Sequence, residues 1–100
     1  MSRIRLPNRR LHEIHDLEFQ GQHFTLGVGR FDDGALAEVF IDPAKSSQMT
    51  AIARDAAVCV SIALQHGVPS DALRSAVTRE ATGEAAGLVG AVLDLLEARP

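Results

Sequence analysis

The first half of the chain alternates hydrophobic and polar residues with a period of two. In "HDLEFQ" and "HFTLGVGRF" every second side chain is suited to one buried face, which is typical of a β-strand. Gln20-Gly21 and Asp32-Asp33-Gly34 are turn sequences, and they separate these segments from a third one, "ALAEVFI". Residues 15–42 are therefore predicted to form a three-stranded antiparallel meander.

After the third strand the hydrophobic spacing becomes that of a helix. Apolar residues recur at three- and four-residue intervals from Met49 to Leu64, which predicts a helix of about five turns. Val58, Cys59 and Ile62 add apolar side chains outside this stripe. We therefore expect the helix to be covered on more than one flank, with Cys59 as an inert core residue.

Two further helices are predicted toward the end of the chain. Ser46 or Ser47 is suited to cap the long helix, and Gly67 is suited to end it. A short helix is expected over residues 69–77, a loop over 78–87 and a last helix in "LVGAVLDLLEA". The order β-β-β-α-α-α predicts an α+β fold with three helices packed on one face of the sheet.

The charge is distributed unevenly along the 100 residues, which are enough for one domain. Residues 1–10 hold four arginines and no carboxylate, so residues 11–100 hold the other six of ten Lys and Arg against all thirteen Asp and Glu. We divide the chain into a basic N-terminal arm, 1–10, and a single domain, 11–100. A nucleic-acid module would show its basic stripe on the folded body, so the arm is interpreted as a solvated terminus.

Two observations bear on the cellular compartment. The longest apolar run, residues 56–64, is much shorter than the roughly 20 residues of a membrane-spanning helix, and no signal peptide is recognisable. The single cysteine excludes an intramolecular disulfide and fits a reducing compartment. We expect a cytoplasmic protein with no membrane contact.

The glycine-rich stretch "GVGRFDDG" does not fit a dinucleotide-binding fingerprint, because Asp32 stands where the third glycine is needed and a strand follows. Gly27 and Gly29 are expected to serve packing, with contact to a partner as the alternative. His12 and His15 would point to opposite faces of a strand, so a zinc site is not expected. No metal or other cofactor is predicted.

Polar residues of the long helix are expected to be structural. Arg54 and Asp55 could form an ion pair or pin an N-terminal strand, and His66 is placed with them as a structural polar residue. Nothing near them completes a catalytic set, so no catalytic residue is predicted.

Seven short strings together resemble a known family. In order, "LPNRR", "GRFDDG", "AEVFID", "ARDAA", "ALQHGVP", "LRSAVTR" and "GLVGAVLDLL" are similar to the C-terminal accessory region, the TSCPD domain, of adenosylcobalamin-dependent ribonucleotide reductases. The similarity runs from about Leu6 to Leu96. The resemblance implies that the Thr-Ser-Cys motif lies upstream of "LPNRR", and that the cobalamin and nucleotide sites belong to a catalytic barrel.

Ribonucleotide reduction in that family needs a radical-forming cysteine and a redox pair, whereas this chain has Cys59 alone. We therefore expect a free-standing, non-catalytic homologue without cofactor sites. It would act through protein–protein contact, either with itself or with a reductase catalytic chain. The alternative is a small nucleotide- or nucleic-acid-binding module. Its partner or phosphate contacts would be Arg5, Arg9, Arg10, Gly27, Gly29 and Arg30.

Self-association is expected from the third strand, which carries apolar residues on both faces. Leu36 and Phe40 would lie on the face opposite the helices and remain in water unless another molecule packs there. The sequence thus predicts a homodimer with two-fold symmetry and with Leu36 and Phe40 at its interface.

Overall fold

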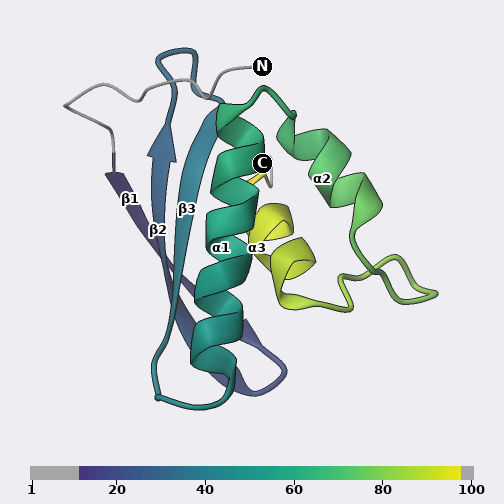
Figure 1. Ribbon diagram of the computed structural model, residues 1–100. Helices are drawn as coiled ribbons and strands as arrows, with labels where there is room; N and C mark the ends of the chain where they lie inside the picture. Colours follow the sequence, from purple (N-terminus) through teal and green to yellow (C-terminus); the bar gives the residue numbers. More distant parts are fainter. Residues whose placement is uncertain (1–11, 98–100) are drawn as a thin grey trace.

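The computed structural model describes residues 12–97 as a three-stranded antiparallel sheet followed by three helices (Figure 1). The elements are β1 His12–Phe19, β2 Gln22–Arg30, β3 Leu36–Pro43, α1 Met49–Gln65, α2 Ser70–Ala76 and α3 Leu88–Leu96. The strand order is β1-β2-β3, as a meander requires. The predicted α+β fold is confirmed.

Both predicted hairpin turns are present. Gln20 and Gly21 have φ angles of 52° and 76°, so both lie in the left-handed region that a two-residue type I′ turn needs. In the second turn Gly34 has a φ of 90°, and the Asp33 side chain accepts a hydrogen bond from the Ala35 N–H (2.9 Å). These turns fix the register of the sheet.

Local signals also set the ends of α1. Gln48 occupies the cap position of α1 without a side-chain cap hydrogen bond, and the Ser47 hydroxyl just before it accepts a hydrogen bond from the Met49 N–H (3.0 Å). At the other end Gly67 has a φ of 93°, and the N–H groups of Gly67 and Val68 donate to carbonyl groups of the last turn. This arrangement is a Schellman motif, which a glycine accommodates without strain.

The helices form a second layer on one face of the sheet. The long helix α1 lies along β3, α3 lies beside it and reaches β1, and α2 packs on α3 outside this layer (Figure 1). Between the layers lies one apolar core, made of Phe24, Leu26, Val28, Leu36, Val39, Ile41, Ala53, Ala57, Val60, Leu64, Val92, Leu93 and Leu96. Aliphatic residues and one Phe thus form the centre of the molecule.

A bulge in β3 changes the predicted position of Leu36. Gly29 pairs with Glu38 and the next residue, Arg30, pairs with Leu36, so Ala37 is an extra residue in the strand. The bulge shifts the side-chain alternation by one position, and Leu36 turns into the core with only 3% of its surface exposed. The expectation that Leu36 is exposed at an interface is wrong, whereas Phe40 is 51% exposed on the outer face.

The buried side of α1 is narrower than the sequence indicates. Ala53, Ala57, Val60 and Leu64 are buried, but Cys59 is exposed and is not a core residue. Within the described chain this helix has one covered side, because the sheet and α3 lie on that side only. The expectation that other flanks are covered is therefore also wrong for the single chain.

Candidate interaction surface

The side of α1 turned away from the sheet carries an apolar surface. We define the α1 outer face as Ile52, Asp55, Val58, Cys59 and Ile62, all of which are exposed. The side chains of Ile52, Val58 and Ile62 keep 58%, 54% and 40% of their surface in contact with solvent. A surface helix usually places polar residues here, so this face is unusual for a helix covered on one side only.

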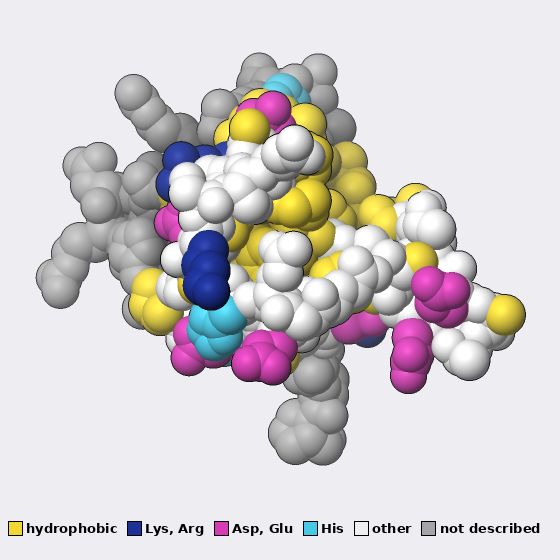
Figure 2. All heavy atoms as spheres, turned by 90° about the horizontal axis from the view of Figure 1, so that it is seen from below, with side chains coloured by type: hydrophobic (Ala, Val, Ile, Leu, Met, Phe, Trp, Pro, Cys, Tyr) yellow, Lys and Arg dark blue, Asp and Glu magenta, His cyan; other side chains and the backbone are white. Residues whose placement is uncertain are grey.

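Two grooves border the α1 outer face. A groove of about 540 Å³ runs between α1 and β3, with Phe40, Val58 and Ile62 among its lining residues. A second groove, of about 340 Å³, lies between the start of α1 and the start of α3, with Ile52 and Leu88 among its lining residues. Figure 2 shows the molecule from below, relative to Figure 1, and hydrophobic side chains gather in the middle of this view. The apolar surface thus extends to both sides of the helix.

Two buried polar residues of α1, Ser61 and Gln65, attach the helix to the edge of β3, and Ser61 also lines the first groove. The Ser61 hydroxyl accepts a hydrogen bond from the Val39 N–H (2.9 Å) and donates one to the Val39 carbonyl (3.1 Å). The Gln65 amide donates to the carbonyl of Ala37, the bulge residue (3.1 Å). Sequence analysis missed both residues. The sequence feature that could have identified them is the spacing of two polar residues, four positions apart, in an otherwise apolar segment of the helix.

The polar residues of α1 that were predicted to be structural differ from one another in burial and in contacts. Arg54 forms an ion pair with Asp42 at the end of β3 (3.1 Å), not with its neighbour Asp55. Both partners are more than half exposed, so the pair adds little stability. Asp55 is exposed, and His66 is half-buried at the end of α1, where its backbone N–H donates to carbonyl groups of the last turn.

The Arg30 side chain forms hydrogen bonds to other parts of the same chain. Its guanidinium donates to the Glu13 carboxylate (2.5 Å), to the Gly34 carbonyl (3.0 Å) and to the Leu96 carbonyl at the end of α3 (3.4 Å). The hydrogen bond from Arg30, followed by one from His15, holds the pKa of Glu13 below its usual value. Arg30 therefore joins two strands to the end of α3, and these contacts account for its presence without a phosphate.

The two glycines of β2 make room for neighbours on β3. A Cβ at Gly29 would lie 2.9 Å from the Glu38 side chain, and one at Gly27 would lie 3.4 Å from the Phe40 ring. The packing role expected for them is thus visible in the sheet. Their contact with a partner stays a prediction. The arginines of the arm, Arg5, Arg9 and Arg10, lie outside the described residues.

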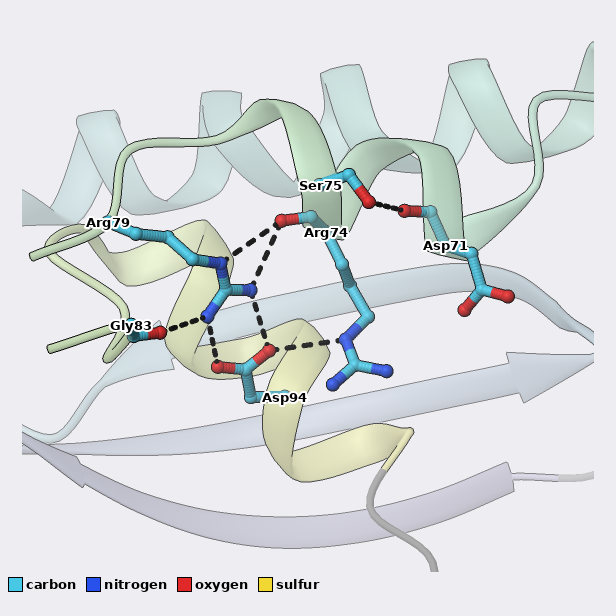
Figure 3. Close-up of polar contacts among 6 residues, drawn as sticks. All are labelled: Asp71, Arg74, Ser75, Arg79, Gly83 and Asp94. Carbon is cyan, nitrogen blue, oxygen red and sulfur yellow. Dashed lines mark hydrogen bonds and ion pairs between the residues drawn. The ribbon is translucent and has the colours of Figure 1, made fainter. Parts of the chain in front are cut away.

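A polar cluster links α2, α3 and the loop between them (Figure 3). Arg79 binds both oxygens of Asp94 (2.8 Å each), and Arg74 donates to the same carboxylate (3.2 Å). Arg79 also donates to the carbonyls of Arg74 and Gly83. These contacts hold the pKa of Asp94 at about 2, chiefly through the hydrogen bond from Arg79. The cluster therefore fastens the loop.

Metal-binding clusters and membrane-spanning helices are both absent from the part of the chain that the structure describes. Among the side chains that the structure describes, no group of three or more His, Cys, Asp or Glu could hold a metal ion, and the side chain of His12 is not among those described. None of the helices there is long and apolar enough to cross a membrane.

The described part of the chain is thus a small α+β domain with an apolar helix face open to solvent. Its sequence is similar to a region of the vitamin B12-dependent ribonucleotide reductases of Bradyrhizobium diazoefficiens and Agrobacterium fabrum. Each is 35% identical over 77 residues, which cover 76% of this chain and 6% of the reductase. The chain therefore spans only a small part of these relatives. No family model and no solved structure matches it.

Proposed function

We propose that this chain is a non-catalytic accessory domain of the TSCPD type that acts through protein–protein contact, with a second copy or with a reductase catalytic chain. The observation that carries the proposal is its similarity to one region of two vitamin B12-dependent ribonucleotide reductases. The α1 outer face supports it, because exposed apolar surface of this kind marks contact sites.

The composition of the chain also supports a role in contact rather than catalysis. The family that this chain resembles uses several cysteines to reduce a ribonucleotide, whereas this sequence has one cysteine. That residue, Cys59, lies exposed on the α1 outer face. A side chain there is placed to meet another molecule.

Binding to a purified vitamin B12-dependent ribonucleotide reductase tests the proposal. We expect the chain to bind the reductase or itself, and Ile62→Glu to weaken that binding at least about tenfold by placing a charge in an apolar contact. The matched control is Leu95→Glu, since Leu95 on α3 is also partly exposed (38%) and lies outside the α1 outer face. If the chain binds neither molecule at about 100 µM, or if both variants bind as the native chain does, the proposal is wrong.

A further inference from the structure

The outer face of the sheet, which is turned away from the helices, is acidic and partly apolar. Its side chains come from every second residue of the strands, and the exposed apolar and acidic ones are Ile14, Asp16, Glu18, Phe40 and Asp42. Arg30 is the one Lys or Arg of the three strands, and it bonds to Glu13 and to the end of α3 on the helix side. The strands therefore present carboxylates on this face without a Lys or Arg of their own, so the face is complementary to a basic segment.

One end of the outer face is covered. Glu38 is only 6% exposed, and Gly29, its neighbour in the sheet, is also buried. The Glu38 side chain lies over Gly29, where a Cβ would be 2.9 Å from it. Because the helices pack on the other face (Figure 1), we attribute this cover to a different segment of the chain. A buried carboxylate needs hydrogen bonds or a cation, so the covering segment is expected to be basic.

The N-terminal arm enters the sheet at this same end. β1 begins at His12, whose Cα partner is Gly29, and Gly29 in turn pairs with Glu38. Neighbouring strands lie about 4.8 Å apart, so Glu38 is about 10 Å across the sheet from the start of β1. An extended chain spans about 3.3 Å per residue, so about three residues cover this distance. Counting back from His12, these residues lead to Arg10 and Arg9.

We infer that the arm turns at the start of β1 and crosses the outer face over Gly29, where Arg9 and Arg10 bind the Glu38 carboxylate. The chain's own arm is the occupant because it holds four arginines and no carboxylate and is joined to the sheet at this point. Gly29 permits the close approach, since it has no side chain. The arm is then part of the folded domain, and not the solvated terminus that its composition indicates. The inference goes beyond the proposed function, which concerns the α1 outer face on the other side of the molecule.

A double-mutant cycle in the full chain tests the pairing. Glu38→Gln and the variant Arg9→Gln/Arg10→Gln are made separately and together, and urea denaturation gives the equilibrium constant of unfolding for each. We expect the two changes to be coupled at least about fivefold, because a buried carboxylate depends strongly on its cation. The matched control, Arg3→Gln/Arg5→Gln, removes the same charge from the same arm and should couple with Glu38→Gln by less than about twofold. Coupling that is absent, or that is as large in the control cycle, would overturn the inference.

Nuclear magnetic resonance keeps the inference testable even if Glu38→Gln does not fold. In Arg9→Gln/Arg10→Gln we expect the backbone amide signals of Gly29 and Glu38 to shift, whereas that of Ser75 on α2 stays in place. The shifts should be the same in dilute and in concentrated samples, because the arm belongs to the same chain. Unchanged signals would contradict the inference. Shifts that require a concentrated sample would assign the cover to the arm of a second copy, and would overturn it as well.

Discussion

Asp94 joins three segments of the second half of the chain through one carboxylate. It lies on α3 and accepts hydrogen bonds from Arg74 of α2 and from Arg79 of the following loop. The two-point contact with Arg79 is the geometry in which a guanidinium binds a carboxylate best. At the scale of single residues, this contact lowers the pKa of Asp94 to about 2.

We expect Asp94→Asn to lower the free energy of unfolding by about 1–2 kcal/mol at pH 7, since about a third of the carboxylate is exposed and water screens the pair. The pKa of Asp94 falls from 3.8 to about 2 on folding, so its contribution is complete above pH 3.8 and is lost as the pH falls through about 2. Urea denaturation should show the difference from the native chain shrinking over that range. Glu84→Gln, an exposed change in the same loop, is the control and should have little effect.

At the scale of elements, α1 and β3 are held together by more than apolar packing. Ser61 satisfies both backbone groups of Val39 from the helix side, and it is nearly buried (8% exposed). Gln65 does the same for the carbonyl of the bulge residue, Ala37. Buried backbone groups need such partners, so the helix can lie in only one position along the strand.

Ser61→Ala should lower the free energy of unfolding by about 1–3 kcal/mol, because it leaves the N–H and carbonyl of Val39 without a partner. Ser75→Ala is the matched control: the Ser75 hydroxyl also donates to a backbone carbonyl in a helix, but it is exposed. Both changes alter helix propensity alike, so the difference between them isolates the buried contact. Chemical denaturation measures it. Equal losses in the two variants would show that the Ser61 contact contributes nothing.

Most of the elements could be predicted because their signals are local. The alternation of the strands, the two turns and Gly67 each depend on a few neighbouring residues. The position of Leu36 depends instead on a bulge, and a bulge is decided by the pairing of β3 with β2. Likewise, nothing local shows that Cys59 stays exposed, because its burial depends on how many elements surround α1.

The candidate site was only partly predictable, for the same reason. Phe40 is exposed, as expected, because it lies after the bulge, in the part of β3 where the side chains alternate regularly between the two faces. Arg30 was named as a possible partner or phosphate contact, and this stays a prediction; the sequence did not indicate that the fold brings Glu13 and the end of α3 to it. Those contacts join residues far apart in the sequence, which periodicity cannot reveal.

At the scale of the whole molecule, we expect no reduction of ribonucleotides by the purified chain alone. A single thiol cannot both form a radical and deliver two reducing equivalents, and Cys59 is the one cysteine in the sequence. The test supplies ribonucleoside diphosphates, adenosylcobalamin and a dithiol, and measures deoxyribonucleotides, with a full-length vitamin B12-dependent reductase as positive control. Turnover that disappears in Cys59→Ser would contradict this expectation.

The hydrogen bonds that Ser61 and Gln65 make to β3 also limit how copies of the chain can aggregate. An edge strand with free backbone groups can accept further strands without end, which is how sheets grow into fibres. At Ala37 and Val39 of β3 these outward groups are already bonded to the helix. A strand from another molecule would have to displace both side chains before it could add there. On this edge, the residues that anchor the helix therefore also protect the protein from fibrous growth.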